Sequence, residues 1–63
     1  MKETEQNYAR TFSTAAGREV LAHLRRITIE RVLGVDASDA QLRGLVAQRQ
    51  LVHQIENMIA RGT

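Results

Sequence analysis

The chain has 63 residues, a formal net charge of +2 and no cysteine, proline or tryptophan. A chain this short buries only about 60% of the surface that its unfolded form exposes, so we expect marginal stability in isolation. The lack of cysteine excludes disulfides and thiolate metal sites, which stabilise many small domains. The small net charge does not by itself indicate nucleic acid as a partner. The composition therefore favours one domain, residues 1–63, stabilised by helix packing and by self-association or a protein partner.

The N-terminal residues are polar and contain no apolar signal-peptide core, and no stretch of the chain approaches the roughly 18 to 20 apolar residues of a membrane-spanning helix. We therefore expect residues 1–7 to be disordered. We also expect the protein to work in a cytoplasm or in a particle assembled there, without a signal peptide and away from membranes.

Tyr8 and Phe12 are four residues apart, which places both rings on one face of a short helical turn. They either cap the core, which is the favoured interpretation, or anchor a partner.

The first long helix is predicted over residues 14–33. A hydroxyl at Ser13 or Thr14 can accept an unpaired backbone N–H of its first turn. Apolar residues then recur at helical spacing, at Ala16, Val20, Leu21, Leu24 and Ile27. Gly17 interrupts this pattern at a cost of about 1 kcal/mol relative to alanine, which a second backbone passing close to it would explain.

Residues 27–33 alternate β-branched side chains as a strand would, but no second strand is available to pair with them. We therefore expect the helix to continue to Leu33, with a distortion near Thr28. Gly34 follows, where a left-handed C-terminal cap would end the helix.

The second helix is predicted over residues 38–61. Ser38 followed by Gln41 is the pattern of a capping box. Its apolar stripe consists of Leu42, Leu45, Val46, Leu51, Val52, Ile55, Met58 and Ile59. Leu51 and Met58 lie to one side of the line through Leu45, Val52 and Ile59, which makes the stripe wider than one neighbouring helix can cover.

These elements predict an all-α fold, an antiparallel helical hairpin preceded by a short helical or disordered arm. Because the stripe is too wide for a hairpin, self-association or a partner is expected to complete the fold. A dimer forming a four-helix bundle would satisfy the stripe, and so would docking on a larger assembly.

The sequence offers little for catalysis. Glu19 and His23 are paired on the first helix, and His53 and Glu56 on the second. The di-metal centres of helical bundles need more carboxylates and the order Glu-x-x-His in both pairs, so solvated surface pairs are favoured over a metal site. We predict no catalytic residue, no cofactor and no metal.

Eight of the nine basic residues are arginines. Arg18 and Arg25, with Arg26 beside them, share one face of the first helix and are candidates for phosphate contact. A solvated face is favoured over nucleic-acid binding, which stays an alternative.

Arg49 interrupts the apolar stripe of the second helix. Its side chain either extends along the surface to solvent or reaches across the hairpin. In the second case its acceptors would be a carboxylate, with Glu30 and Glu19 as candidates, or unpaired carbonyls at the distorted end of the first helix.

Several short motifs resemble a family of small proteins encoded by tailed phages and prophages, whose type member is a Bordetella phage protein. The residues that carry the resemblance are Phe12, Ser13, Thr14, Gly17, Val20, Leu21, Leu24 and Arg49. The family has a Glu-Gly-x-Arg element before an apolar helix. This chain keeps Arg49 but has Val46 and Ala47 in place of Glu-Gly.

The resemblance implies a phage or prophage product of a kind often encoded among virion-morphogenesis genes, and it implies no known activity. Together with the small size and the wide apolar stripe, it favours a non-catalytic structural or assembly component of the virion, located in the host cytoplasm or in the virion. Two alternatives remain open, a regulatory binder of a host or phage protein and a nucleic-acid accessory or packaging factor. The candidate structural or interaction residues are Arg49, Tyr8, Phe12, Leu51, Met58, Arg18 and Arg25.

Overall fold

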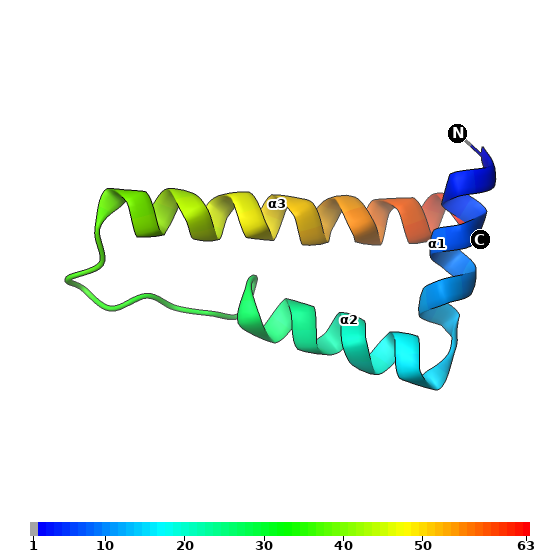
Figure 1. Ribbon diagram of the computed structural model, residues 1–63, viewed down its shortest axis with the longest axis horizontal. Coiled ribbons are helices and arrows are strands. Elements are labelled where there is room, and N and C mark those ends of the chain that lie inside the picture. Colours follow the sequence, from blue (N-terminus) through cyan, green and yellow to red (C-terminus); the bar gives the residue numbers. More distant parts are fainter. Residues whose placement is uncertain (1) are drawn as a thin grey trace.

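The computed structural model describes residues 2–63, which form three helices and no strand (Figure 1). The helices are α1 (Lys2–Ser13), α2 (Ala15–Ile27) and α3 (Asp39–Gly62). α2 and α3 lie side by side and run in opposite directions, and α1 crosses the end of this pair where α3 ends (Figure 1). The all-α class predicted from the sequence is confirmed.

Residues 2–7 belong to α1, so of the two forms considered for the N-terminal arm the helical one is present and the expected disorder is not. Residue 1 lies outside the described residues. Glu3 and Glu5 stand in the first turn, where negative charge favours a helix. The most extensive packing between helices is that of α1 on α3, and Ala9 of α1 is buried. This tertiary packing explains why a polar segment is ordered.

Two glycines allow α1 to approach its neighbours closely. A Cβ atom at Gly17 of α2 would lie 2.1 Å from the carbonyl oxygen of Thr11 and 2.8 Å from Cα of Phe12. A Cβ atom at Gly62 of α3 would lie 2.1 Å from the carbonyl oxygen of Glu5. The close backbone approach predicted for Gly17 is confirmed, and the backbone is that of α1.

α2 begins as predicted, because the Thr14 hydroxyl accepts a hydrogen bond from the Gly17 N–H at 2.9 Å. It ends at Ile27, six residues before the predicted end at Leu33. The Thr28 hydroxyl donates to the Leu24 carbonyl at 2.6 Å, which supports the predicted distortion at this residue. β-Branched side chains are stiff and crowd the preceding helical turn, so the run that follows leaves the helix.

Gly34 is not the left-handed cap that the sequence suggested, because its φ angle is not positive and the helix has already ended. The start of α3 is confirmed in detail. The Gln41 N–H donates to the Ser38 hydroxyl at 3.1 Å, and the Ser38 N–H donates to the Gln41 side chain at 2.9 Å. This reciprocal pair is the predicted capping box.

The molecule is flat, with extents of 42, 24 and 11 Å. Only three apolar residues of the described chain are buried, namely Ala9, Leu45 and Val52. Domains usually pack two layers of secondary structure around a core. Here α2 and α3 form a single layer with α1 across one end, so the core is thin.

The glycine contacts generate a paired prediction. Gly17→Ala should lower the free energy of unfolding by more than about 1 kcal/mol, although alanine is the better helix former, because its Cβ would overlap main-chain atoms of α1. Gly44→Ala is the matched control, since a Cβ there meets nothing within 4 Å. The control should raise stability by up to about 1 kcal/mol. Urea denaturation followed by circular dichroism measures both, and equal effects would contradict the close approach at Gly17.

Candidate functional site

Arg49 joins α3 to the segment that follows α2. Its Nε donates to the Thr28 carbonyl at 3.0 Å and its Nη2 donates to the Arg31 carbonyl at 2.6 Å. Of the acceptors considered from the sequence, the carbonyls are therefore the right ones, and neither Glu30 nor Glu19 is bonded to this side chain. The alternative in which Arg49 only extends to solvent is wrong.

The acceptors are the carbonyl of Thr28, which caps α2, and that of Arg31 in the segment that follows. The last turn of any helix leaves carbonyl groups without helical partners, and buried ones need another donor. Thr28 is 5% exposed, so water has little access to it. A guanidinium carries several N–H donors in a planar arrangement and can serve two carbonyls at once. Arg49 thereby stabilises the early end of α2 and fixes its position along α3.

A second polar contact between α2 and α3 was missed in the sequence. Arg25 donates to the carboxylate of Glu56 in a part-buried ion pair, and His53 Nδ1 lies 3.4 Å from the other oxygen of that carboxylate. Arg25 therefore does not share a free basic face with Arg18, which is itself exposed. One signal was present, because Glu56 follows Arg49 by seven residues and so lies on the same side of α3.

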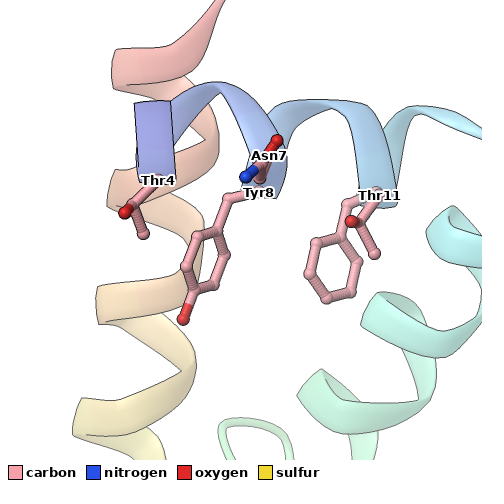
Figure 2. A pocket seen from close by; sticks show the side chains of 5 residues that line it. Thr4, Asn7, Tyr8 and Thr11 are labelled. Atoms are coloured by element: carbon pink, nitrogen blue, oxygen red, sulfur yellow. The ribbon is translucent and has the colours of Figure 1, made fainter. Parts of the chain in front are cut away.

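Tyr8 and Phe12 stand four residues apart on one face of α1, and Figure 2 shows the ring of Tyr8 projecting from this helix. Their ring centroids are 6.5 Å apart with an angle of 21° between the planes, and both residues are half-buried. They line a shallow hollow together with Thr4, Asn7 and Thr11. Because the rings are neither enclosed nor fully open, their role as a core cap or as an anchor stays a prediction.

Several large apolar side chains remain exposed. Leu51, one of the two residues expected on the uncovered flank of α3, is 59% exposed, and Met58 is half-buried. The other exposed ones are Val20, Ile27, Val32, Val35, Leu42 and Val46. The stripe is thus wider than α1 and α2 cover, as the spacing of its residues indicated.

No group of three or more histidine, aspartate or glutamate side chains within residues 2–63 is arranged to hold a metal ion. The carboxylate of Glu56, which lies next to His53, already forms an ion pair with Arg25. His53 and Glu56 therefore belong to the polar contact that joins α2 to α3.

Comparison with known proteins decides the family. The sequence model of the Bbp19-like phage proteins matches residues 8–60, which is most of the chain. The chain belongs to this family. The match spans Phe12, Gly17 and Arg49, and it confirms the resemblance drawn from those motifs.

Neither a curated protein nor a solved structure matches this Bbp19-like protein. Within its described residues, no helix combines the length and the apolar character needed to cross a membrane.

The contacts of Arg49 lead to a prediction about stability. Arg49→Met should lower the free energy of unfolding by about 2 kcal/mol, because two charge-assisted hydrogen bonds are lost and the Thr28 carbonyl keeps only the 3.3 Å bond from the Arg31 N–H. Arg43→Met, at an exposed position of the same helix, is the control and should change stability by less than about 0.5 kcal/mol. Chemical denaturation of both variants provides the measurement. A neutral or stabilising Arg49→Met would contradict the bridging role.

The ion pair between α2 and α3 can be tested by a double-mutant cycle. Arg25→Gln, Glu56→Gln and the double variant should give a coupling energy of about 1 kcal/mol that declines as salt is added, as expected for a part-buried pair. A coupling energy of zero at low ionic strength would show that the two side chains do not interact in solution.

Proposed function

We propose that this Bbp19-like phage protein is a non-catalytic component that acts through protein contacts in the structure or assembly of the virion. One observation carries the proposal. A chain of a phage family exposes large apolar side chains on both of its long helices, including Val20 on α2 and Leu51 on α3. Exposed apolar surface of this kind marks interaction sites in proteins.

The polar side chains support a structural role over a catalytic one. Among the groups with the chemistry for proton transfer or charge stabilisation, Arg25 and His53 both contact the carboxylate of Glu56. The hollow beside Tyr8 and Phe12 is open and lined by uncharged side chains. Catalysis usually relies on an enclosed site with titratable groups directed into it.

The placement of the arginines weighs against a nucleic-acid accessory role. Arg25 and Arg49 donate within the chain, to Glu56 and to main-chain carbonyls. The phosphate-binding face suggested by the sequence thus loses Arg25 as a free cation. Nucleic-acid affinity depends mainly on the number of phosphates that free cationic side chains neutralise.

Quantitative mass spectrometry of purified particles tests the proposal. In a phage that encodes this protein, the codon for Gln41 is changed to a stop, and the same phage with the codon restored is the control. We expect the protein in control particles at a fixed ratio to the capsid protein, or a several-fold loss of intact particles in the stop variant.

The proposal would be overturned if the control particles lacked the protein and both strains gave a normal yield of infectious particles. In that case, stable capture of one host protein would support the regulatory alternative. Binding to DNA that weakens steeply with salt would support the nucleic-acid alternative.

A further inference from the structure

Arg25 and Glu56 define how α2 and α3 face each other. Because the two side chains form an ion pair, each points from its own helix toward the other helix. They therefore give a common reference direction for the remaining side chains of both helices, at 100° per residue around a helix with 3.6 residues per turn.

The apolar residues of the two helices stand at identical offsets from this pair. Val20, Leu24 and Ile27 lie five residues before, one residue before and two residues after Arg25. Leu51, Ile55 and Met58 lie at the same three offsets from Glu56. In both helices the three side chains are therefore rotated in the same sense, by roughly a third of a turn, from the direction of the neighbouring helix.

Equal rotation puts both sets on one side of the layer. A rotation by 180° about an axis perpendicular to the plane of two antiparallel helices exchanges one helix for the other. This rotation leaves every side chain on the side of the plane where it started, so side chains rotated equally on the two helices lie on the same side. The two triplets together form what we call the apolar face, consisting of Val20, Leu24, Ile27, Leu51, Ile55 and Met58. It carries no charged residue.

Within the chain this face is only partly covered. Val20, Ile27 and Leu51 are 52%, 44% and 59% exposed, whereas Leu24, Ile55 and Met58 are half-buried. The ring of Tyr8 projects from α1 at the end of the layer that this helix crosses (Figure 2), and the ring of Phe12 lies beside it. Most of the layer has no second layer over it, because α1 crosses only that end (Figure 1).

The surface area indicates how large the missing partner surface is. The chain exposes 4878 Å², whereas a compact monomer of its mass, 7.1 kDa, exposes about 4,100 Å². The excess of about 800 Å² equals the area that each partner loses in an interface of standard size. The molecule measures 42 by 24 Å along its two long axes, and the part of the layer beyond the end that α1 crosses provides the surface for such an interface (Figure 1).

The dimensions favour a second copy as the occupant. The radius of gyration is 13.7 Å, whereas a compact chain of this length would have about 10.6 Å and one of twice the length about 13.8 Å. Stacking a second flat layer at the usual helix-packing distance of about 10 Å leaves the two long dimensions unchanged. Two copies stacked in this way thus approach the compactness of an ordinary domain of their combined length.

We infer that the apolar face binds a second copy of this chain face to face, about a two-fold axis, to form a dimer of two layers. An uncharged face brings no like charges together when it meets its own copy. This inference goes beyond the role in the virion and does not depend on it, because it concerns the purified protein alone.

Sedimentation equilibrium of the full chain tests the inference, with Leu51→Arg as the variant on the apolar face. Val46→Arg is the matched control, since Val46 is an apolar residue of α3 with 49% exposure. It stands ten residues before Glu56 and is rotated about 80° in the opposite sense, onto the other side of the layer.

We expect the wild-type chain and Val46→Arg to be dimers with dissociation constants within about threefold of each other, because the control residue lies outside the interface. Leu51→Arg should raise the constant by more than about 100-fold, because each copy would bury an unpaired charge. Ile27→Arg, on α2, should act in the same direction and shows whether both helices contribute.

Circular dichroism of each variant separates loss of the dimer from loss of folding, and Leu51→Ser replaces Leu51→Arg if the arginine variant is unfolded. A wild-type chain that stays monomeric up to millimolar concentration would overturn the inference. Dimerisation that is weakened equally by Val46→Arg and Leu51→Arg, or by neither, would overturn it as well.

Discussion

The guanidinium of Arg49 donates to the carbonyls of Thr28 and Arg31 and so holds the segment after α2 against α3. The rest of the arrangement depends on this contact because little apolar surface is buried between the two helices. On α3, only Leu45 and Val52 are buried. Apolar contact varies little when one helix slides along another, whereas two directed hydrogen bonds and an ion pair specify one register. The polar groups therefore define how α2 and α3 lie together.

The polar contacts between α2 and α3 also determine where the apolar residues lie. Arg49 and Glu56 occupy the side of α3 that faces α2, and Arg25 occupies the matching side of α2. The part of the wide apolar stripe that contains Leu51, Ile55 and Met58 is then rotated out of the plane of the two helices. A small chain thereby has a defined register and an apolar face directed outward, at the expense of a core of its own.

Local signals in the sequence predicted the features that residues close in sequence decide. The capping of α2 by Thr14 and the capping box of Ser38 and Gln41 each depend on atoms within three residues, and both are present. The order of residues 2–7 depends on packing against α3 near Gly62, which no local pattern shows. The bond from Arg25 to Glu56 likewise requires the register of two helices.

Membership in the Bbp19-like phage family gives the origin of the chain, and the contacts limit what each part of its surface can do. A second copy on the apolar face would leave the other side of each layer, with Arg18 and Val46 exposed, and the hollow beside Tyr8 and Phe12 as the surfaces open to further proteins. A two-fold dimer presents each of these surfaces twice. Such a dimer would be suited to joining two equivalent sites of an assembly, which agrees with the role proposed for this chain in the virion.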